Sequence, residues 1–125
     1  MQVTPISFGH KHIMKKLWKK NKLPTVKRGL YGDLLTKDNL SLEHGNPVSL
    51  GGKTITDNLF LASKEKNHAR GNKPITEFLT KEMAEAYFEQ FKDVVVKIGK
   101  QIVFIGNDYI QKATKTLKSL GVNLN

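Results

Sequence analysis

Four polar residues in the middle of the chain carry groups that can move a proton and hold a metal ion. Glu43 stands directly before His44. Two asparagines follow, Asn58 at 14 residues after His44 and Asn67 nine residues further on. An imidazole with a pKa of about 6.5 can be neutral at working pH and accept a proton from water. Carboxylate and amide oxygens suit Mg²⁺ or Mn²⁺, so the set fits metal-assisted attack of water on a phosphodiester.

The residues around the acid and the histidine predict how this pair is positioned. The run 40–43 suits a short strand, and the run 59–61 suits a second strand or an extended entry into a helix. Adjacent residues of a strand point to opposite faces, so Glu43 and His44 can serve one site only if the first strand ends there. Gly45 permits the backbone to turn at this point.

A short polar helix is expected after the second strand. Ser63 can cap its N-terminus, and Gly71 can end it after about two turns. Its single apolar residue is Ala69, so burial of an apolar face does not explain the helix. Presenting Asn67 and, three positions on, Arg70 on one face would explain it.

In order and spacing, these residues resemble the HNH nuclease family. The resemblance covers residues 40–73 through the runs LEHGNPVSLGG, DNLFLA and KNHARGN. It implies a ββα-metal finger, in which an acid and a histidine end the first strand and a second asparagine lies on the helix. Stand-alone HNH proteins of this size are frequent in phages and prophages, so the resemblance suggests such an origin.

Two features depart from the usual family pattern. Glu43 stands where the family more often has aspartate, which lengthens the ligand arm. The chain has no cysteine, whereas many members hold a structural zinc with cysteine pairs, so core packing must hold this finger together. The glycines of the run 51–52 fit either a turn or a close approach of backbone to phosphate.

The resemblance implies a role for each residue of the site. His44 is expected to be the general base, and Glu43 and Asn67 are expected to hold one divalent cation, Mg²⁺ or Mn²⁺. Asn58 would tether the loop and help orient His44. His68 is expected to make a phosphate or structural contact rather than to bind the metal. The implied activity is hydrolysis of DNA, with one site cutting one strand, so that duplex cleavage would need a second subunit or a second event.

Positive charge favours a polyanionic partner. The net charge is +10, and no acid precedes Asp33. We expect DNA as the partner, without excluding RNA, and leave the oligomeric state open. The residues expected to contact phosphate lie around the finger and on a basic helix within 11–20: Arg70, Lys64, Lys66, Lys73, Lys15, Lys16, Lys19 and Lys20.

Two other functions remain open. A non-catalytic nucleic-acid-binding module would use the same basic surface without turnover. A membrane-surface or protein-interaction domain would use the amphipathic helix 11–20. No apolar run approaches the ~20 residues of a membrane-spanning helix, and the N-terminus lacks the apolar core of a secretory signal. With no cysteine either, we expect a soluble cytoplasmic protein without a membrane partner.

A chain of 125 residues has room for one domain, and we expect the α+β class. Its parts would be a basic N-terminal helix and connector over 1–38, the HNH finger over 39–73, and a C-terminal packing layer over 74–125.

The packing layer is expected to contain two helices and a hairpin. The first helix covers 75–94, either unbroken or restarting at Thr80. A hairpin turning at residues 99–100 is favoured over continuation of this helix. Asn107 would cap the final helix, and Gly121 would close it.

Overall fold

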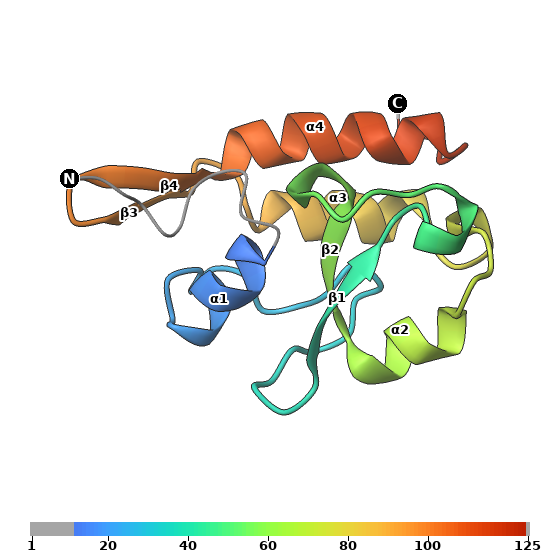
Figure 1. Ribbon diagram of the computed structural model, residues 1–125, viewed down its shortest axis with the longest axis horizontal. Helices are drawn as coiled ribbons and strands as arrows, with labels where there is room; N and C mark the ends of the chain where they lie inside the picture. The colour runs from blue at the N-terminus through green and yellow to red at the C-terminus, as the bar shows by residue number, and fades with distance from the viewer. Residues whose placement is uncertain (1–11, 125) are drawn as a thin grey trace.

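The computed structural model describes residues 12–124, and over these residues the chain is a small α+β domain (Figure 1). It contains four α-helices and two antiparallel sheets of two strands each. The predicted α+β class is confirmed. No helix among residues 12–124 is long and apolar enough to cross a membrane.

The strands and the helix predicted around the site follow one another as a ββα unit. Strand β1 spans Leu40–His44 and pairs with β2, Leu59–Ser63, and helix α2 continues directly over Lys64–Arg70. The Ser63 hydroxyl accepts a hydrogen bond from the backbone N–H of Lys66, which confirms the predicted cap. In the register, His44 lies opposite Leu59. The end of β1 is therefore beside the start of β2, and α2 begins at the other end of the pair.

The N-terminal segment covers one side of this unit. Helix α1, Ile13–Lys19, buries Ile13, Met14 and Leu17 and packs against β1. Lys11, with which the predicted basic helix begins, lies outside the described residues. The connector after α1 is mostly irregular, with one isolated antiparallel bridge between Arg28 and Leu34.

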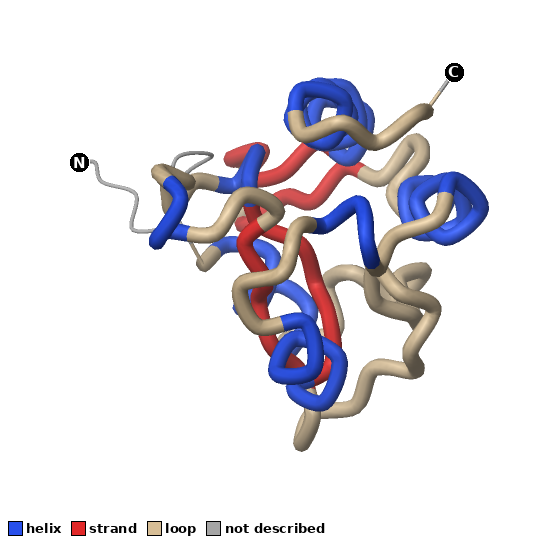
Figure 2. Tube along the Cα trace, turned by 90° about the vertical axis from the view of Figure 1, so that its right-hand side faces the viewer, coloured by secondary structure: helices blue, strands red, loops and turns tan. Residues whose placement is uncertain are grey.

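The C-terminal layer holds β2 in place through buried aromatic side chains. Helix α3 spans Lys81–Glu89, and helix α4 spans Gly106–Ser119. The Tyr109 hydroxyl of α4 donates to the Leu59 carbonyl at 2.8 Å, and the Tyr87 hydroxyl of α3 accepts from the Leu61 N–H at 3.0 Å. In Figure 2, α4 lies above the strands β1 and β2, and α2 lies in front of their lower ends. The core cluster therefore joins β2 and the C-terminal helices, and the buried residues of α1 belong to the same cluster.

The helix expected over 75–94 is not continuous. A short 3₁₀ turn at Ile75–Glu77 precedes α3, and the chain restarts at Thr80, whose hydroxyl accepts from the Met83 N–H at 3.1 Å. The alternative with a restart at Thr80 is correct.

The hairpin prediction is confirmed, with β3 over Val95–Ile98 and β4 over Gln101–Ile105. The cap assigned to Asn107 is wrong. Strand β4 runs straight into α4 at Gly106, where an added Cβ would lie 1.9 Å from the Phe91 carbonyl oxygen. Asn107 instead accepts from the Asp93 N–H at 2.9 Å, so it joins two segments rather than capping the helix.

Candidate active site

Three of the predicted site residues line one hollow. Glu43 and His44 come from the end of β1, and Asn67 comes from the middle of α2. With Arg70 and neighbouring loop residues they surround a volume of about 260 Å³. The fold therefore brings together an acid, an imidazole and an amide from two elements.

Glu43 lies at the buried wall of this hollow, with 2% of its surface exposed. Its Oε2 accepts a hydrogen bond from Arg70 Nη1 at 2.7 Å and a second one from the Tyr31 hydroxyl. Its Oε1 is buried and has no hydrogen-bond partner among the described residues. Burial raises the pKa of Glu43, while the bonds from Tyr31 and Arg70 oppose that rise.

The burial of Arg70 contradicts the prediction that this side chain contacts phosphate. Only 1% of the side chain is exposed, because the last turn of α2 faces the end of β1. Nε donates to the Lys73 carbonyl at 2.8 Å, Nη1 also donates to the His44 carbonyl at 2.9 Å, and Nη2 donates to the Gly45 carbonyl at 2.8 Å. The guanidinium is thus occupied by the protein itself and does not present its charge to a partner.

His44 is half-buried, and a side chain of the following loop holds its ring. Nε2 lies 2.9 Å from the Thr54 hydroxyl. If that oxygen accepts from Nε2–H, Nδ1 keeps its lone pair, which is the form a general base needs. Burial lowers the pKa of His44, so the ring stays neutral to a lower pH than an exposed histidine.

Asn58 is buried behind the loop that it was predicted to tether. Its amide oxygen accepts from the Asn46 N–H at 2.8 Å, and its nitrogen donates to the Asn46 carbonyl at 3.0 Å and to the Lys53 carbonyl at 2.8 Å. These bonds join the start and the middle of the loop to Asn58 at its end. Asn58 can act on His44 through this loop, since Lys53 directly precedes the Thr54 that contacts the ring.

Close packing explains the glycines of this loop. At Gly45, an added Cβ would lie 2.8 Å from the Phe60 ring and 3.1 Å from Asn58 Oδ1, so glycine provides space here. Gly51 has a φ of +93°, and a Cβ on Gly52 would lie 1.7 Å from the Asn46 carbonyl oxygen. The turn, rather than an approach to phosphate, accounts for both of these glycines.

Hydrogen bonds orient the amide of Asn67. Its nitrogen donates to the Ser41 hydroxyl at 3.0 Å and to the Leu42 carbonyl at 3.3 Å. A carbonyl oxygen can only accept, so the NH₂ group must face β1. The amide oxygen then points away from the strand, where it can serve as a ligand.

The donor set fits Mg²⁺ or Mn²⁺ as a site completed by water and, when it is bound, by substrate. Among residues 12–124, no three or more His, Cys, Asp or Glu side chains gather into a metal site. Glu43 and Asn67 offer one oxygen each, and Mg²⁺ commonly uses one or two carboxylates while keeping waters and substrate phosphates. The unpartnered Oε1 of Glu43 is the observation that favours the fit, since a buried carboxylate oxygen without a partner calls for an explanation.

The predicted lysines lie at the surface. Lys64 and Lys66 are exposed on α2, and Lys73 is exposed with its ammonium 5.5 Å from the centre of the Phe78 ring. A second hollow, of about 530 Å³, is lined by Lys64, His68 and Asn67, so it adjoins the first one. On α1, Lys15 is half-buried, and Lys16 and Lys19 are exposed, as is Lys20 directly after the helix.

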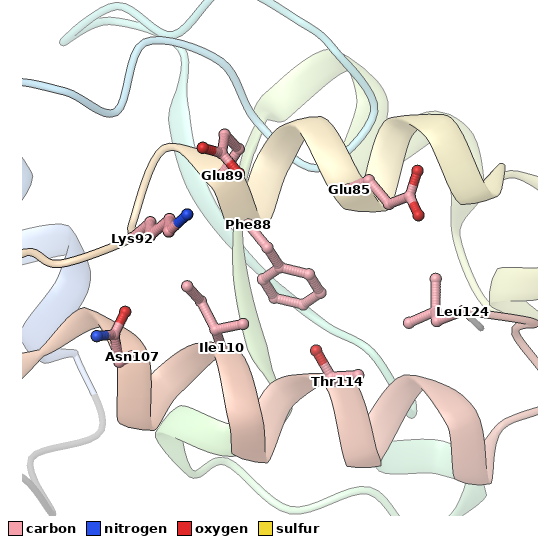
Figure 3. Close-up of a pocket in the computed structure, with 8 residues that line it drawn as sticks. All are labelled: Glu85, Phe88, Glu89, Lys92, Asn107, Ile110, Thr114 and Leu124. Atoms are coloured by element: carbon pink, nitrogen blue, oxygen red, sulfur yellow. The ribbon is translucent and has the colours of Figure 1, made fainter.

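A further hollow of about 530 Å³ lies between α3 and α4 (Figure 3). Phe88 of α3 and Ile110 of α4 project into it from opposite sides, and Glu85 and Glu89 line it from α3. No histidine is found among its described lining residues, and its carboxylates would repel phosphate. The hollow at Glu43 and His44 is therefore the better candidate for chemistry on a polyanion.

Two residues of the site carried no signal in the sequence. Tyr31 lies in the irregular connector, and Thr54 lies in the loop after β1. Tyrosine and threonine at such positions are ordinary, and only their contacts with Glu43 and His44 mark them.

No family model, no curated protein and no solved structure matches the chain. The likeness to HNH nucleases therefore depends on the residues themselves and their arrangement.

Proposed function

We propose that the protein is a metal-dependent endonuclease of the HNH kind, which hydrolyses phosphodiester bonds in DNA. The observation that carries this proposal is the convergence of Glu43, His44 and Asn67 on one hollow, from the end of β1 and from α2 of a ββα unit. A base and two oxygen donors beside one open volume meet the needs of phosphodiester hydrolysis.

His44 would act as the general base. The attacking water would give its proton to Nδ1, while Thr54 holds the ring through Nε2. The lowered pKa of His44 keeps the imidazole unprotonated at neutral pH. Proton transfer to a positioned side chain of this kind contributes about 10²–10⁴-fold to a rate.

Glu43 and Asn67 would hold one Mg²⁺ or Mn²⁺ through Oε1 and the amide oxygen. When bound, the ion would stabilise negative charge on the phosphate oxygens and on the leaving 3′ oxygen. Asn58 would keep the loop, and with it Thr54, in a fixed position. The hollow contains one such set, so each site would nick one strand.

The exposed lysines would bind the DNA backbone. Lys64 and Lys66 lie on the helix that carries Asn67, and Lys73 follows shortly after it. The lysines of α1 would extend this contact, in keeping with a net charge of +10.

Nicking of supercoiled plasmid tests this function. We expect wild type to convert supercoiled to open-circular DNA in Mg²⁺ or Mn²⁺, and His44→Ala to lose this activity. His12→Ala is a matched control, because that histidine is exposed at the start of α1 and lines neither hollow at the site. Equal nicking by wild type and His44→Ala, or none by wild type across metals and pH, would reject the proposal.

The pairing of Glu43 with Arg70 favours a second candidate, a non-catalytic nucleic-acid-binding module. In that function the guanidinium is the permanent partner of Glu43, and the ββα unit serves only as a scaffold. Salt-sensitive binding to duplex DNA, without cleavage in any divalent metal, would identify this function.

A further inference from the structure

We infer that Tyr31 and Arg70 are positioning residues for the Glu43 carboxylate. Both donate hydrogen bonds to Oε2, so that Oε1 is the oxygen that binds the cation. This inference rests on the proposed metal site. It adds two residues that act on the ligand rather than on the substrate, one of them in the connector far from the motif.

Both donors converge on the same oxygen. Arg70 Nη1 lies 2.7 Å from Oε2, and the Tyr31 hydroxyl donates to that atom as well. Tyr31 is 6% exposed and Arg70 is 1% exposed, so bulk water does not compete with these bonds. Two hydrogen bonds to one oxygen, one of them from a guanidinium, fix the rotation of the carboxyl group.

The other oxygen, Oε1, has no hydrogen-bond partner among residues 12–124. Oε1 is buried and makes no hydrogen bond to any described residue, although Glu43 has two donors close to Oε2. Glu43 lines the same hollow as Asn67. The NH₂ group of Asn67 is turned to β1, so its amide oxygen is the atom that remains as a metal ligand. The two side chains are thus arranged in the same way. The protein holds Oε2 of Glu43 and the NH₂ group of Asn67, and the other oxygen of each side chain is the candidate ligand.

Arg70 also connects the ligand to the base. The guanidinium that holds Oε2 donates to the carbonyls of His44 and Gly45, and its Nε holds the Lys73 carbonyl after α2. One side chain therefore sets the orientation of Glu43, the end of β1 at His44, and the closeness of α2. The longer arm of glutamate, compared with aspartate, has an extra rotatable bond, and Tyr31 and Arg70 are what restrain it.

Binding of Mn²⁺ to the full-length protein without DNA tests the inference. Tyr31→Phe removes the hydroxyl and keeps the ring, which packs edge-on against Phe78. Tyr109→Phe is the matched control, because it removes another buried hydroxyl, one that binds Leu59 and Tyr87 rather than Glu43. We expect calorimetric titration to show a Kd for Mn²⁺ about tenfold weaker in Tyr31→Phe, the lower end of the usual loss for such supporting residues, and unchanged in Tyr109→Phe.

A Kd of Tyr31→Phe equal to or tighter than that of wild type overturns the inference. If wild type nicks DNA with Mn²⁺ in that case, the proposed function still holds. If wild type neither binds Mn²⁺ nor nicks DNA, the proposed function fails, and the role of Oε1 fails with it.

A crystal soaked in Mn²⁺ gives a readout that does not depend on the folding of any variant. We expect anomalous density beside Oε1 and the Asn67 amide oxygen, with Arg70 and Tyr31 still on Oε2. A cation on Oε2 that has displaced Arg70 would refute the division of the two oxygens.

Discussion

Removing the Arg70 guanidinium should destabilise the fold more than any change of an exposed cation. Arg70→Met keeps a side chain of similar length but removes four hydrogen bonds, to Glu43, His44, Gly45 and Lys73. Loss of one partner of a buried ion pair costs about 3–5 kcal/mol, because the other charge stays buried. Whole domains are stable by only about 5–15 kcal/mol, so this is a large part of the total.

The pH dependence of this loss follows from the pKa of Glu43. Burial already raises it, and without Arg70 it should rise further. Above the usual carboxyl pKa of 4.5, the unfolded state releases a proton that the folded state still binds at Glu43. The stability of the variant therefore falls as the pH rises from 4.5 through the pKa of Glu43 in the folded state. The destabilisation by Arg70→Met should therefore be larger at pH 8 than at pH 5, since a carboxyl with a raised pKa is protonated to a greater extent at the lower pH.

Urea unfolding can measure these differences through Trp18, the single tryptophan, which packs on the core and donates to the Val26 carbonyl at 2.8 Å. A double-mutant cycle separates the ion pair from the rest. Arg70→Met combined with Glu43→Gln should be less destabilised than the sum of the single variants, because no charge is left buried alone. Lys66→Met is the control: it removes an exposed cation of the same helix, and should change stability by no more than about 0.5 kcal/mol.

Two results would refute this reasoning. One is a loss below about 1 kcal/mol for Arg70→Met, which is less than a buried ion pair should cost. The other is strict additivity in the cycle, which would mean that Arg70 and Glu43 do not interact.

Other expected outcomes concern the base, the loop and the lysines. The nicking rate should rise with pH to a plateau, with a midpoint below 6.5 because burial lowers the pKa of His44; a midpoint well above that value in a pH profile of kcat/KM would contradict it. Asn58→Ala should cost about 1–3 kcal/mol, measured by urea unfolding, since it leaves the carbonyls of Asn46 and Lys53 without their donor; unchanged stability would show that the loop does not need this tether. Replacing Lys64 and Lys66 by alanine should reduce the slope of log K against log salt by about one per lysine in fluorescence-anisotropy titrations of duplex DNA, and an unchanged slope would exclude them as phosphate contacts.

The elements around the site were predictable because their signals are local. Ser63 and Gly71 mark the two ends of α2, and both predictions are confirmed. The errors came where distant segments meet. The cap assigned to Asn107 failed because Gly106 packs against the Phe91 carbonyl, and no pattern within the helix itself announces that contact.

The types and order of Glu43, His44, Asn58 and Asn67 could be read from the chain, because chemistry and spacing are properties of the residues alone. The burial of Arg70 could not. An arginine on a short polar helix can face solvent or protein, and the choice is made by packing against residues far away in sequence, here Glu43, 27 positions earlier. Tyr31 meets the same oxygen from the connector, 12 positions before it. Long-range packing therefore determines which carboxylate oxygen is held and which has no partner among the described residues.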